Sequence, residues 1–290
     1  MKDMLFGLIR PIYSQSALSH TFHESEFVIS AMNLNLKNKY ALVCGGTDGI
    51  GWASAVELAK MGANVWLFAR NKEKLKLKVA LLDISKGQKH RFLVADFTDR
   101  TAVEEALASN KCHFHIVVNN SGGPEGGAIL DEKPEKFEAT FQQHLVINQI
   151  IVQHVVPFMK AEKFGRIINI ISVSVKQPIL GLGVSNTVRW AVAAWAKTLS
   201  KELSHTGITV NNVLPGYTKT GRLAEVNEMR AKTEKKSVEK LEAEMEANVP
   251  SGRFATPDEV GAAVAFLASP VAFSINGINL PVDGGLAATL

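Results

Sequence analysis

A glycine-rich segment has the composition and the position of a phosphate-binding turn. Residues 44–51 read CGGTDGIG; they follow an apolar run at 40–44 and precede residues 52–60, whose apolar positions have helical spacing. Glycines in such a turn let backbone N–H groups approach a pyrophosphate at the N-terminus of a helix. Glycine is also common in turns that bind nothing, so other motifs must support this interpretation. The predicted nucleotide contacts are Gly45, Thr47, Asp48, Gly49, Ile50 and Gly51.

The end of the second apolar run indicates which nucleotide the turn would bind. A site selective for NAD carries a carboxylate there for the ribose 2′-hydroxyl, whereas residues 68–71 read FARN and contain no acid. Arg70 would instead pair with the 2′-phosphate of NADP(H) in a charge-assisted contact. A surface arginine at the start of a helix is the alternative. We therefore predict NADP(H) in preference to NAD(H).

Short apolar runs, separated by helical or polar stretches, must position these groups. The runs lie at residues 40–44, 64–69, 91–95, 115–118, 167–171, 209–213 and 278–282. Long helical segments at about 137–159 and 187–203 precede the runs at 167–171 and 209–213, respectively. Alternating strands and helices imply crossover connections and a parallel sheet. We therefore predict an α/β fold, a Rossmann-type doubly wound parallel sheet of about seven strands, in one domain at residues 32–290.

Two segments depart from this rhythm. Residues 222–248 are charged and helical in propensity, and their place after Pro215 and Gly216 predicts a helical flap over a pocket. A pair of solvated surface helices is the alternative. Residues 1–31 are rich in Ser and His and show no sustained period, so we interpret them as an N-terminal extension, disordered or not native, with Met32 as a candidate start.

The overall composition excludes several classes of partner. The net charge of +4 comes from 32 basic and 28 acidic residues without a block of like charge, which predicts no nucleic-acid partner. No stretch reaches the roughly 18 apolar residues that a membrane span needs. Cys44 and Cys112 are too few for a disulfide framework or a four-ligand zinc site, which favours a reducing, cytoplasmic setting. The run CHFH at 112–115 predicts a strand start and no metal site, because alternate strand residues face opposite sides.

Further motifs follow the glycine turn in a fixed order. They are ADFTD at 95–99, NNSG at 119–122, PGYTKT at 215–220, GRF at 252–254 and VDGG at 282–285. Together with the spacing of Gly45, Gly49 and Gly51, they resemble the short-chain dehydrogenase/reductase family, from about residue 38 to the C-terminus. The resemblance implies that an aspartate binds the adenine and that a threonine of the 215–220 loop meets the nicotinamide carboxamide or the phosphates. The cofactor contacts that it adds are Asp96, Phe97, Asn119, Ser121, Gly122, Pro215, Gly216, Thr218 and Thr220.

The resemblance fails at the catalytic residues. Family enzymes use an Asn, Ser, Tyr and Lys tetrad, in which the tyrosine is the general acid/base and the lysine lowers its pKa and holds the nicotinamide ribose. Ser172 aligns with the serine, but Ser185 stands at the tyrosine position and Arg189 at the lysine position. The motif AKTLSKEL at 196–203 follows at the family distance, which supports this register. His144 stands at the asparagine position.

These replacements change the chemistry of proton transfer. A tyrosine hydroxyl has a pKa of ~10 that a nearby cation lowers, whereas a serine hydroxyl is a far weaker acid. Arg189 stays protonated, so it would hold the cofactor ribose and stabilise an alkoxide but cannot relay a proton. The candidate proton donors are Tyr217, which lies in the 215–220 loop, His144, whose ordinary pKa is nearest neutral pH, and water. For both side chains, plain packing in the core is the alternative.

The combined pattern resembles a divergent subgroup, similar to β-ketoacyl-carrier-protein reductases, that lacks the catalytic tyrosine and lysine. It implies an NADP(H)-dependent oxidoreductase that reduces a carbonyl, of a 3-oxoacyl thioester or another ketone, by hydride transfer, with Ser172 polarising the carbonyl. The missing residues equally support a catalytically inactive NADP(H) sensor or a structural partner subunit.

The resemblance also implies a homodimer or a homotetramer. Family members associate through the helices that correspond to residues 137–160 and 187–203. Trp190, Ala194 and Trp195 would suit such an interface, and a buried core face is the alternative. The predicted partners are thus a small-molecule substrate and a second copy of the chain.

Overall fold

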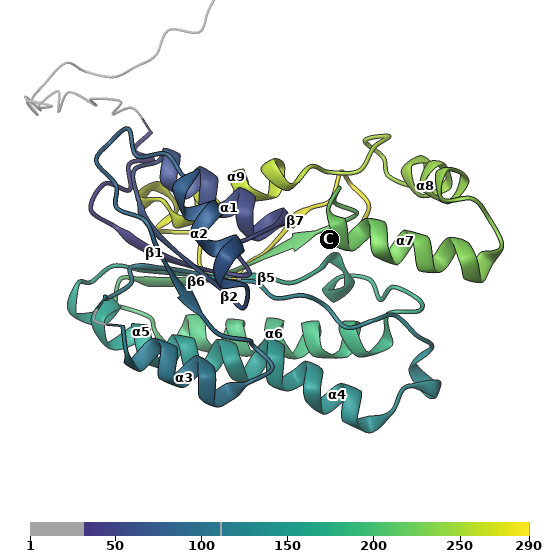
Figure 1. Ribbon diagram of the computed structural model, residues 1–290, viewed down its shortest axis with the longest axis horizontal. Coiled ribbons are helices and arrows are strands. Elements are labelled where there is room, and N and C mark those ends of the chain that lie inside the picture. The colour runs from purple at the N-terminus through teal and green to yellow at the C-terminus, as the bar shows by residue number, and fades with distance from the viewer. Residues whose placement is uncertain (1–31, 111, 290) are drawn as a thin grey trace, which may run out of the picture. The chain divides into compact units, whose positions relative to one another are not determined.

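The protein, seen here in a computed structural model, is described over residues 32–110 and 112–289. A parallel sheet lies between two layers of helices (Figure 1). The strands are β1 (Tyr40–Cys44), β2 (Asn64–Ala69), β3 (Arg91–Val94), β4 (Ile116–Asn119), β5 (Gly165–Ile170), β6 (Ile208–Pro215) and β7 (Asn279–Val282). They pair in the order β3-β2-β1-β4-β5-β6-β7, every pair parallel. The predicted doubly wound sheet is confirmed.

The helices form the two outer layers. Those of the described residues are α1 (Gly49–Lys60), α2 (Lys72–Ala80), α3 (Arg100–Ala108), α4 (Pro134–Phe141), α5 (Ile147–Ala161), α6 (Gly183–Glu202), α7 (Gly221–Glu234), α8 (Val238–Ala247) and α9 (Pro257–Ala268). Figure 1 shows α1 and α9 above the sheet and α3, α5 and α6 below it. The crossovers therefore change face between β1 and β4, which are neighbours in the sheet. Ligands of open α/β sheets bind at such a switch point.

Alternating side chains of the strands supply both halves of the core. Ala41 and Val43 of β1 belong to the apolar cluster with helices α1 and α9. Leu42 and Cys44, which alternate with them, belong to the cluster with α3, α5 and α6. Because a strand directs successive side chains to opposite faces, one fully apolar run serves both layers.

Two helical regions differ in detail from the sequence expectation. The predicted helix at 137–159 is divided into α4 and α5 by a π-helical turn at Gln142–Val146. Such turns add a residue to the helix and occur often at functional sites. The charged segment 222–248 forms α7 and α8. The extension predicted at 1–31 lies outside the described residues.

Candidate active site

A large cavity opens at the carboxyl ends of the central strands. Its volume is about 1400 Å³. The glycine turn after β1 forms one wall, the loop after β4 and the ends of β5 and β6 form others, and α7 covers part of it. The predicted site residues that line it are Gly45, Asp48, Gly49, Ile50, Ser121, Gly122, Ser172, Ser185, Arg189, Pro215, Gly216, Tyr217, Thr218 and Thr220. Gly45 and Thr220, which are 175 positions apart in the sequence, thus share one cavity.

The glycine turn needs its glycines for two separate reasons. Gly45 and Gly49 have φ angles of 58° and 50°, in the left-handed region that favours glycine. Gly51 has an ordinary φ, but a Cβ there would collide with the carbonyl oxygen of Gly45. Asp48 caps α1 without a side-chain hydrogen bond, so no side chain occupies the first N–H groups of this helix. The turn therefore presents backbone donors at a helix N-terminus, as an anion site requires.

Asn120 supports the glycine turn from the loop after β4. Its Nδ2 donates to the carbonyl oxygens of Cys44 and Gly45, at 3.2 and 3.4 Å, and its side chain lines the cavity. The sequence pattern did not single out Asn120 as a site residue. The available signal was its place in the NNSG motif, but the motif does not say which asparagine faces the cavity.

The neighbouring Asn119 is directed into the sheet. It is buried, and its Nδ2 donates to Asn169 Oδ1 at 2.8 Å. The same bond repeats from Asn169 to Asn212 and from Asn212 to Asn279, so amide side chains connect β4, β5, β6 and β7. Asn119 does not line the cavity, in contrast to Ser121 and Gly122.

Two basic side chains lie at the carboxyl end of β2. Arg70 is 79% exposed and its Nη1 is 3.5 Å from Asp96 Oδ2. Lys74, on α2, forms an ion pair with Asp48 of the glycine turn. Neither basic residue lines the cavity itself; both stand at its glycine-turn side. Lys74 was missed by the sequence analysis, because its pairing with a residue of the turn depends on the packing of α2.

Asp96 and Phe97 occupy the end of β3. The Thr98 backbone N–H donates a hydrogen bond to the Asp96 carboxylate. This bond lowers the pKa of the carboxyl group, and partial burial opposes the shift. The Phe97 ring is buried and packs edge-to-face on Phe68, with 5.0 Å between ring centroids. The ring of Phe97 is therefore a core group. Thr47, Gly51, Asp96 and Phe97 do not line the cavity.

Three residues at tetrad positions line the cavity: the retained Ser172 and the replacements Ser185 and Arg189. Ser172 Oγ accepts a hydrogen bond from Ser174 N at 3.0 Å, which leaves the hydroxyl proton free to donate. Arg189 Nη1 donates to the Ile170 carbonyl oxygen at 2.7 Å. Burial lowers the pKa of Arg189 to about 10, so its guanidinium remains charged at neutral pH. A positive charge held in place by this hydrogen bond thus lines the same cavity as the hydroxyl groups of Ser172 and Ser185.

His144 lies behind the cavity wall, in the π-helical turn. It is 3% exposed, and its Nδ1 is hydrogen-bonded to Ser121 Oγ at 2.8 Å. Its Nε2 has no hydrogen-bond partner among the described residues. Burial first, and then the charge of Arg189, hold the pKa of His144 well below its usual range, with the Gly122 backbone opposing them. The ring of His144 is therefore neutral at pH 7, because its burial disfavours the charged form.

Tyr217 separates the large cavity from a smaller one of about 190 Å³. Its ring packs against Phe254, with 5.7 Å between centroids, and no hydrogen bond of its hydroxyl group is found within the described residues. Thr218 Oγ1 donates to the Gly216 carbonyl oxygen at 3.2 Å. Thr220 caps α7 by accepting a hydrogen bond from Leu223 N.

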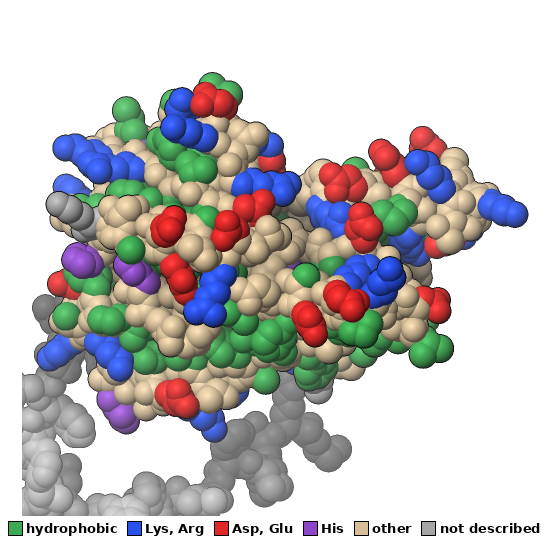
Figure 2. Space-filling model, turned by 60° about the horizontal axis from the view of Figure 1, so that its bottom comes forward, with side chains coloured by type: hydrophobic (Ala, Val, Ile, Leu, Met, Phe, Trp, Pro, Cys, Tyr) green, Lys and Arg blue, Asp and Glu red, His purple; other side chains and the backbone are tan. Residues whose placement is uncertain are grey.

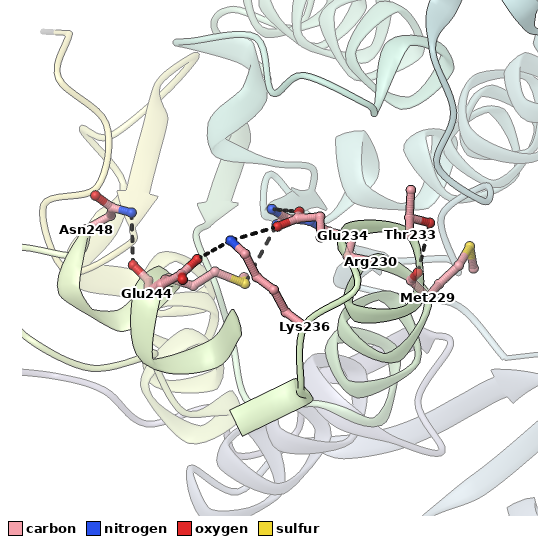
Figure 3. A network of polar contacts seen from close by, with 8 residues as sticks. Met229, Arg230, Thr233, Glu234, Lys236, Glu244 and Asn248 are labelled. Carbon is pink, nitrogen blue, oxygen red and sulfur yellow. Dashed lines mark hydrogen bonds and ion pairs between the residues drawn. The ribbon is translucent and has the colours of Figure 1, made fainter. Parts of the chain in front are cut away.

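The helices α7 and α8 form a charged wall that extends from the sheet (Figure 1). Figure 3 shows the polar contacts between them. Lys236 Nζ lies 3.3 Å from Glu234 of α7 and 2.6 Å from Glu244 of α8, and Arg230 Nη2 lies 3.0 Å from Glu234. These contacts join the two helices to each other. At the other end of α7, Arg222 Nη2 donates to the Pro124 carbonyl oxygen at 2.8 Å.

Outside this cavity the described residues offer no competing metal or membrane site. No group of three or more His, Cys, Asp or Glu side chains among them could hold a metal ion. In the CHFH run, the His113 ring stacks on Phe158 and the His115 ring on Tyr40. No helix in the described part of the chain is long and apolar enough to cross a bilayer.

The chain is similar to known reductases. The family model described as Enoyl-(Acyl carrier protein) reductase matches residues 45–287. The 3-oxoacyl-[acyl-carrier-protein] reductase FabG of Haemophilus influenzae is 34% identical over 254 residues, which cover 87% of this chain and 99% of that protein.

Solved structures agree with these matches. The L-sorbose reductase of Gluconobacter frateurii, complexed with NADPH and L-sorbose, superposes with a TM-score of 0.83 at 27% identity, covering 89% of this chain and 100% of that one. A variant of actinorhodin polyketide ketoreductase with NADPH gives a TM-score of 0.81 at 31% identity, covering 86% of this chain and 97% of that one. On its sequence, its sheet and its cavity, the chain belongs to the short-chain dehydrogenase/reductase family of oxidoreductases.

Proposed function

We propose that the protein is an NADP(H)-dependent oxidoreductase that reduces a carbonyl group, of a 3-oxoacyl thioester or another ketone, by hydride transfer. One observation carries the proposal: the glycine turn with its free helix N-terminus shares a cavity with Ser172, Ser185 and Arg189. The relatives support it, since they are a 3-oxoacyl-[acyl-carrier-protein] reductase, a polyketide ketoreductase and an L-sorbose reductase. Two of these structures hold NADPH.

The residues present fit a phosphorylated dinucleotide. The backbone of the glycine turn would bind the pyrophosphate, because Gly45 and Gly49 line the cavity without a Cβ and α1 is uncapped by a side chain. Arg70 and Lys74 would give up their ion pairs with Asp96 and Asp48 and bind the 2′-phosphate instead. Residues 68–71, at the end of β2, contain no carboxylate that would favour NAD. When bound, NADPH supplies a hydride from its nicotinamide ring.

Around the reacting carbonyl, this chain supplies polarity rather than a strong acid. Ser172 donates its hydroxyl proton in a hydrogen bond to the carbonyl oxygen, while its own oxygen is held by Ser174 N. Arg189 stabilises negative charge on that oxygen, since its guanidinium stays protonated at a pKa of about 10. For the same reason Arg189 cannot donate the proton. The arrangement suits a divergent subgroup of the family that lacks the tyrosine and lysine.

A non-catalytic NADP(H)-binding protein, acting as a sensor or as a structural partner subunit, is the second candidate. The observation in its favour is that Ser185 and Arg189 stand where the family has its acid/base and the lysine that activates it. Such a protein would retain the dinucleotide half of the cavity and bind NADPH without oxidising it.

We also propose that two or four copies of the chain associate through the helices below the sheet. Figure 2 shows hydrophobic side chains gathered along this face. Phe141 and Trp190 are 42% and 49% exposed there, and Ala194 is exposed beside them. Trp195, in contrast, packs in the core and donates to Gln149. Light scattering that gives a monomer mass would reject the association. A reducing, cytoplasmic setting stays a prediction from the two cysteines, both of which are free.

Titration of the purified protein with NADPH and NADH, followed by NADPH oxidation with ketones and β-ketoacyl thioesters, tests the function. Tight NADPH binding with turnover supports the reductase. Tight binding without turnover supports the sensor or the partner subunit. Failure to bind either dinucleotide would refute both.

A further inference from the structure

We propose that Ser121 is the catalytic hydroxyl that passes a proton to the carbonyl oxygen of the substrate, and that His144 is the positioning residue that orients and recharges it. The inference deepens the proposed reductase and rests on it. It joins Ser121, which lies outside the tetrad positions, to His144, which stands at the asparagine position. It thereby assigns to the loop after β4 a part in the chemistry as well as in cofactor binding.

The geometry places Ser121 between the cavity and a buried imidazole. Ser121 lines the cavity, two residues beyond the end of β4, and its Oγ lies 2.8 Å from Nδ1 of His144. His144 does not line the cavity and is 3% exposed, so it reaches the cavity only through this hydroxyl group. The π-helical turn brings the ring to this position by displacing it from the regular spacing of α4 and α5.

The other hydroxyl groups of the cavity have different surroundings. Ser172 accepts from a backbone N–H, Thr218 donates to a backbone carbonyl and Thr220 caps α7. Tyr217 packs on a phenylalanine, and no hydrogen bond of its hydroxyl is found in the described part of the chain. Among the described cavity residues, only Ser121 is hydrogen-bonded to an imidazole. This imidazole is a side chain that can replace a donated proton.

Arg189 completes the arrangement. Its Nη2 lies 3.8 Å from where a Cβ of Gly123 would be, so the guanidinium reaches the loop that contains Ser121. Its charge favours negative charge on a carbonyl oxygen bound at this loop. The same charge, together with burial, keeps His144 neutral, and a neutral ring carries one N–H and one lone pair. A ring of this kind can accept a proton at one nitrogen as it gives one up at the other.

The proton step balances as follows. The carbonyl carbon gains the hydride, the C=O π electrons move to the oxygen, and that oxygen takes the proton of Ser121 Oγ. Nδ1–H of His144 returns a proton to Oγ, and Nε2 takes one from water, which leaves as hydroxide. The reverse shift of the proton from Nε2 to Nδ1 restores the ring before the next turnover. Nε2 is buried and has no partner among the described residues, so this step requires one water molecule to reach it. An alcohol and the oxidised dinucleotide are the products.

Two matched substitutions test the catalytic hydroxyl. Ser121→Ala removes it, and Ser121→Thr keeps it; Ser109→Ala, on the exposed end of α3, is the control. We expect Ser121→Ala to lower kcat about 100-fold, and Ser121→Thr to recover most of the loss. If the wild type turns over and Ser121→Ala retains kcat within threefold, the inference is wrong while the reductase stands. The same holds if only Tyr217→Phe loses turnover. A wild type that oxidises no NADPH overturns both.

A second measurement does not depend on turnover. Nitrogen-15 NMR of histidine-labelled protein at pH 7 should show His144 neutral, with its proton on Nδ1, and Ser121→Ala should shift the Nδ1 resonance. A proton on Nε2, or no shift in the variant, would contradict the relay. For the positioning role, His144→Asn keeps a hydrogen-bonding group near Nδ1 and should retain more kcat than His144→Leu, with His154→Asn, an exposed histidine of α5, as the control.

Discussion

The guanidinium of Arg222 donates a 2.8 Å hydrogen bond to the carbonyl oxygen of Pro124, across the mouth of the cavity. Arg222 belongs to the first turn of α7, and Pro124 to the loop after β4. Both residues line the cavity. This bond joins the charged helical wall to the loop that contains Ser121, so the position of α7 is linked to the position of the candidate reacting groups.

Arg222→Ala should loosen this wall. Because the side chain is 39% exposed, we expect a modest effect, a rise of about threefold in the KM for the carbonyl substrate. Amide hydrogen exchange should become faster in α7 and stay unchanged in α9. Arg100→Ala, which breaks a surface pair with Glu104 on α3, is the control. Unchanged exchange in α7 would mean that other contacts hold the flap.

Gly51→Ala should abolish nucleotide binding. The added methyl group would collide with the Gly45 carbonyl oxygen, so the turn must distort. We expect NADPH affinity to fall about 100-fold or more, in isothermal titration, and the melting temperature to drop. Gly221→Ala is the control for folding, since a Cβ there meets nothing within 4 Å. Normal NADPH binding by Gly51→Ala would show that the turn does not bind the pyrophosphate.

Arg70→Ala should weaken the preference for NADPH over NADH by about tenfold, because one charge-assisted contact to the 2′-phosphate is lost. Lys74→Ala should weaken it further. The ratio of the two Kd values, from quenching of protein fluorescence, measures the effect. Lys76→Ala, on the same helix and paired with Glu73, should leave the ratio unchanged. Equal losses of both nucleotides in Arg70→Ala would indicate a structural role for this arginine.

The buried histidines should make stability depend on pH. Burial lowers the pKa of His115 to about 4, below its unfolded value of 6.5. Between these values the unfolded chain binds more protons, so this part of the stability is full above pH 6.5 and falls as the pH drops toward 4. His144 acts in the same direction.

The melting temperature should fall between pH 6.5 and pH 4, and in His115→Asn this fall should be smaller than in the wild type by about 5 °C. Differential scanning calorimetry at several pH values gives the measurement. The asparagine can still accept the hydrogen bond that Tyr40 N makes to His115 Nδ1. His205→Asn, an exposed histidine with positive φ, is the matched control. An equal pH slope in wild type and His115→Asn would contradict the burial argument.

Local patterns in the sequence were enough for the architecture. The alternation of apolar runs with helical segments predicted the parallel sheet, because residue spacing sets which side chains share a face. The glycine spacing predicted the turn for the same reason, since a positive φ at Gly45 and Gly49 is a property of the local backbone. The absence of a tyrosine at 185 and a lysine at 189 is likewise a fact of residue type.

The candidate site was decided by the tertiary structure. Sequence patterns did not distinguish Asn119, which bonds within the sheet, from Asn120, which holds the glycine turn. They placed Ser121 and His144 in separate roles, and only folding brings these side chains to 2.8 Å. The π-helical turn leaves no mark in the side-chain pattern, because it is a change in backbone hydrogen bonding.

The pKa of a side chain also depends on both residue type and tertiary structure. A histidine's residue type predicts titration near neutral pH, whereas burial and the charge of Arg189 hold the pKa of His144 far below it. Desolvation and charge depend on every atom that surrounds a group in space. Composition and spacing along the chain therefore determine the fold of this protein, and distances between residues remote in sequence determine what its cavity can do.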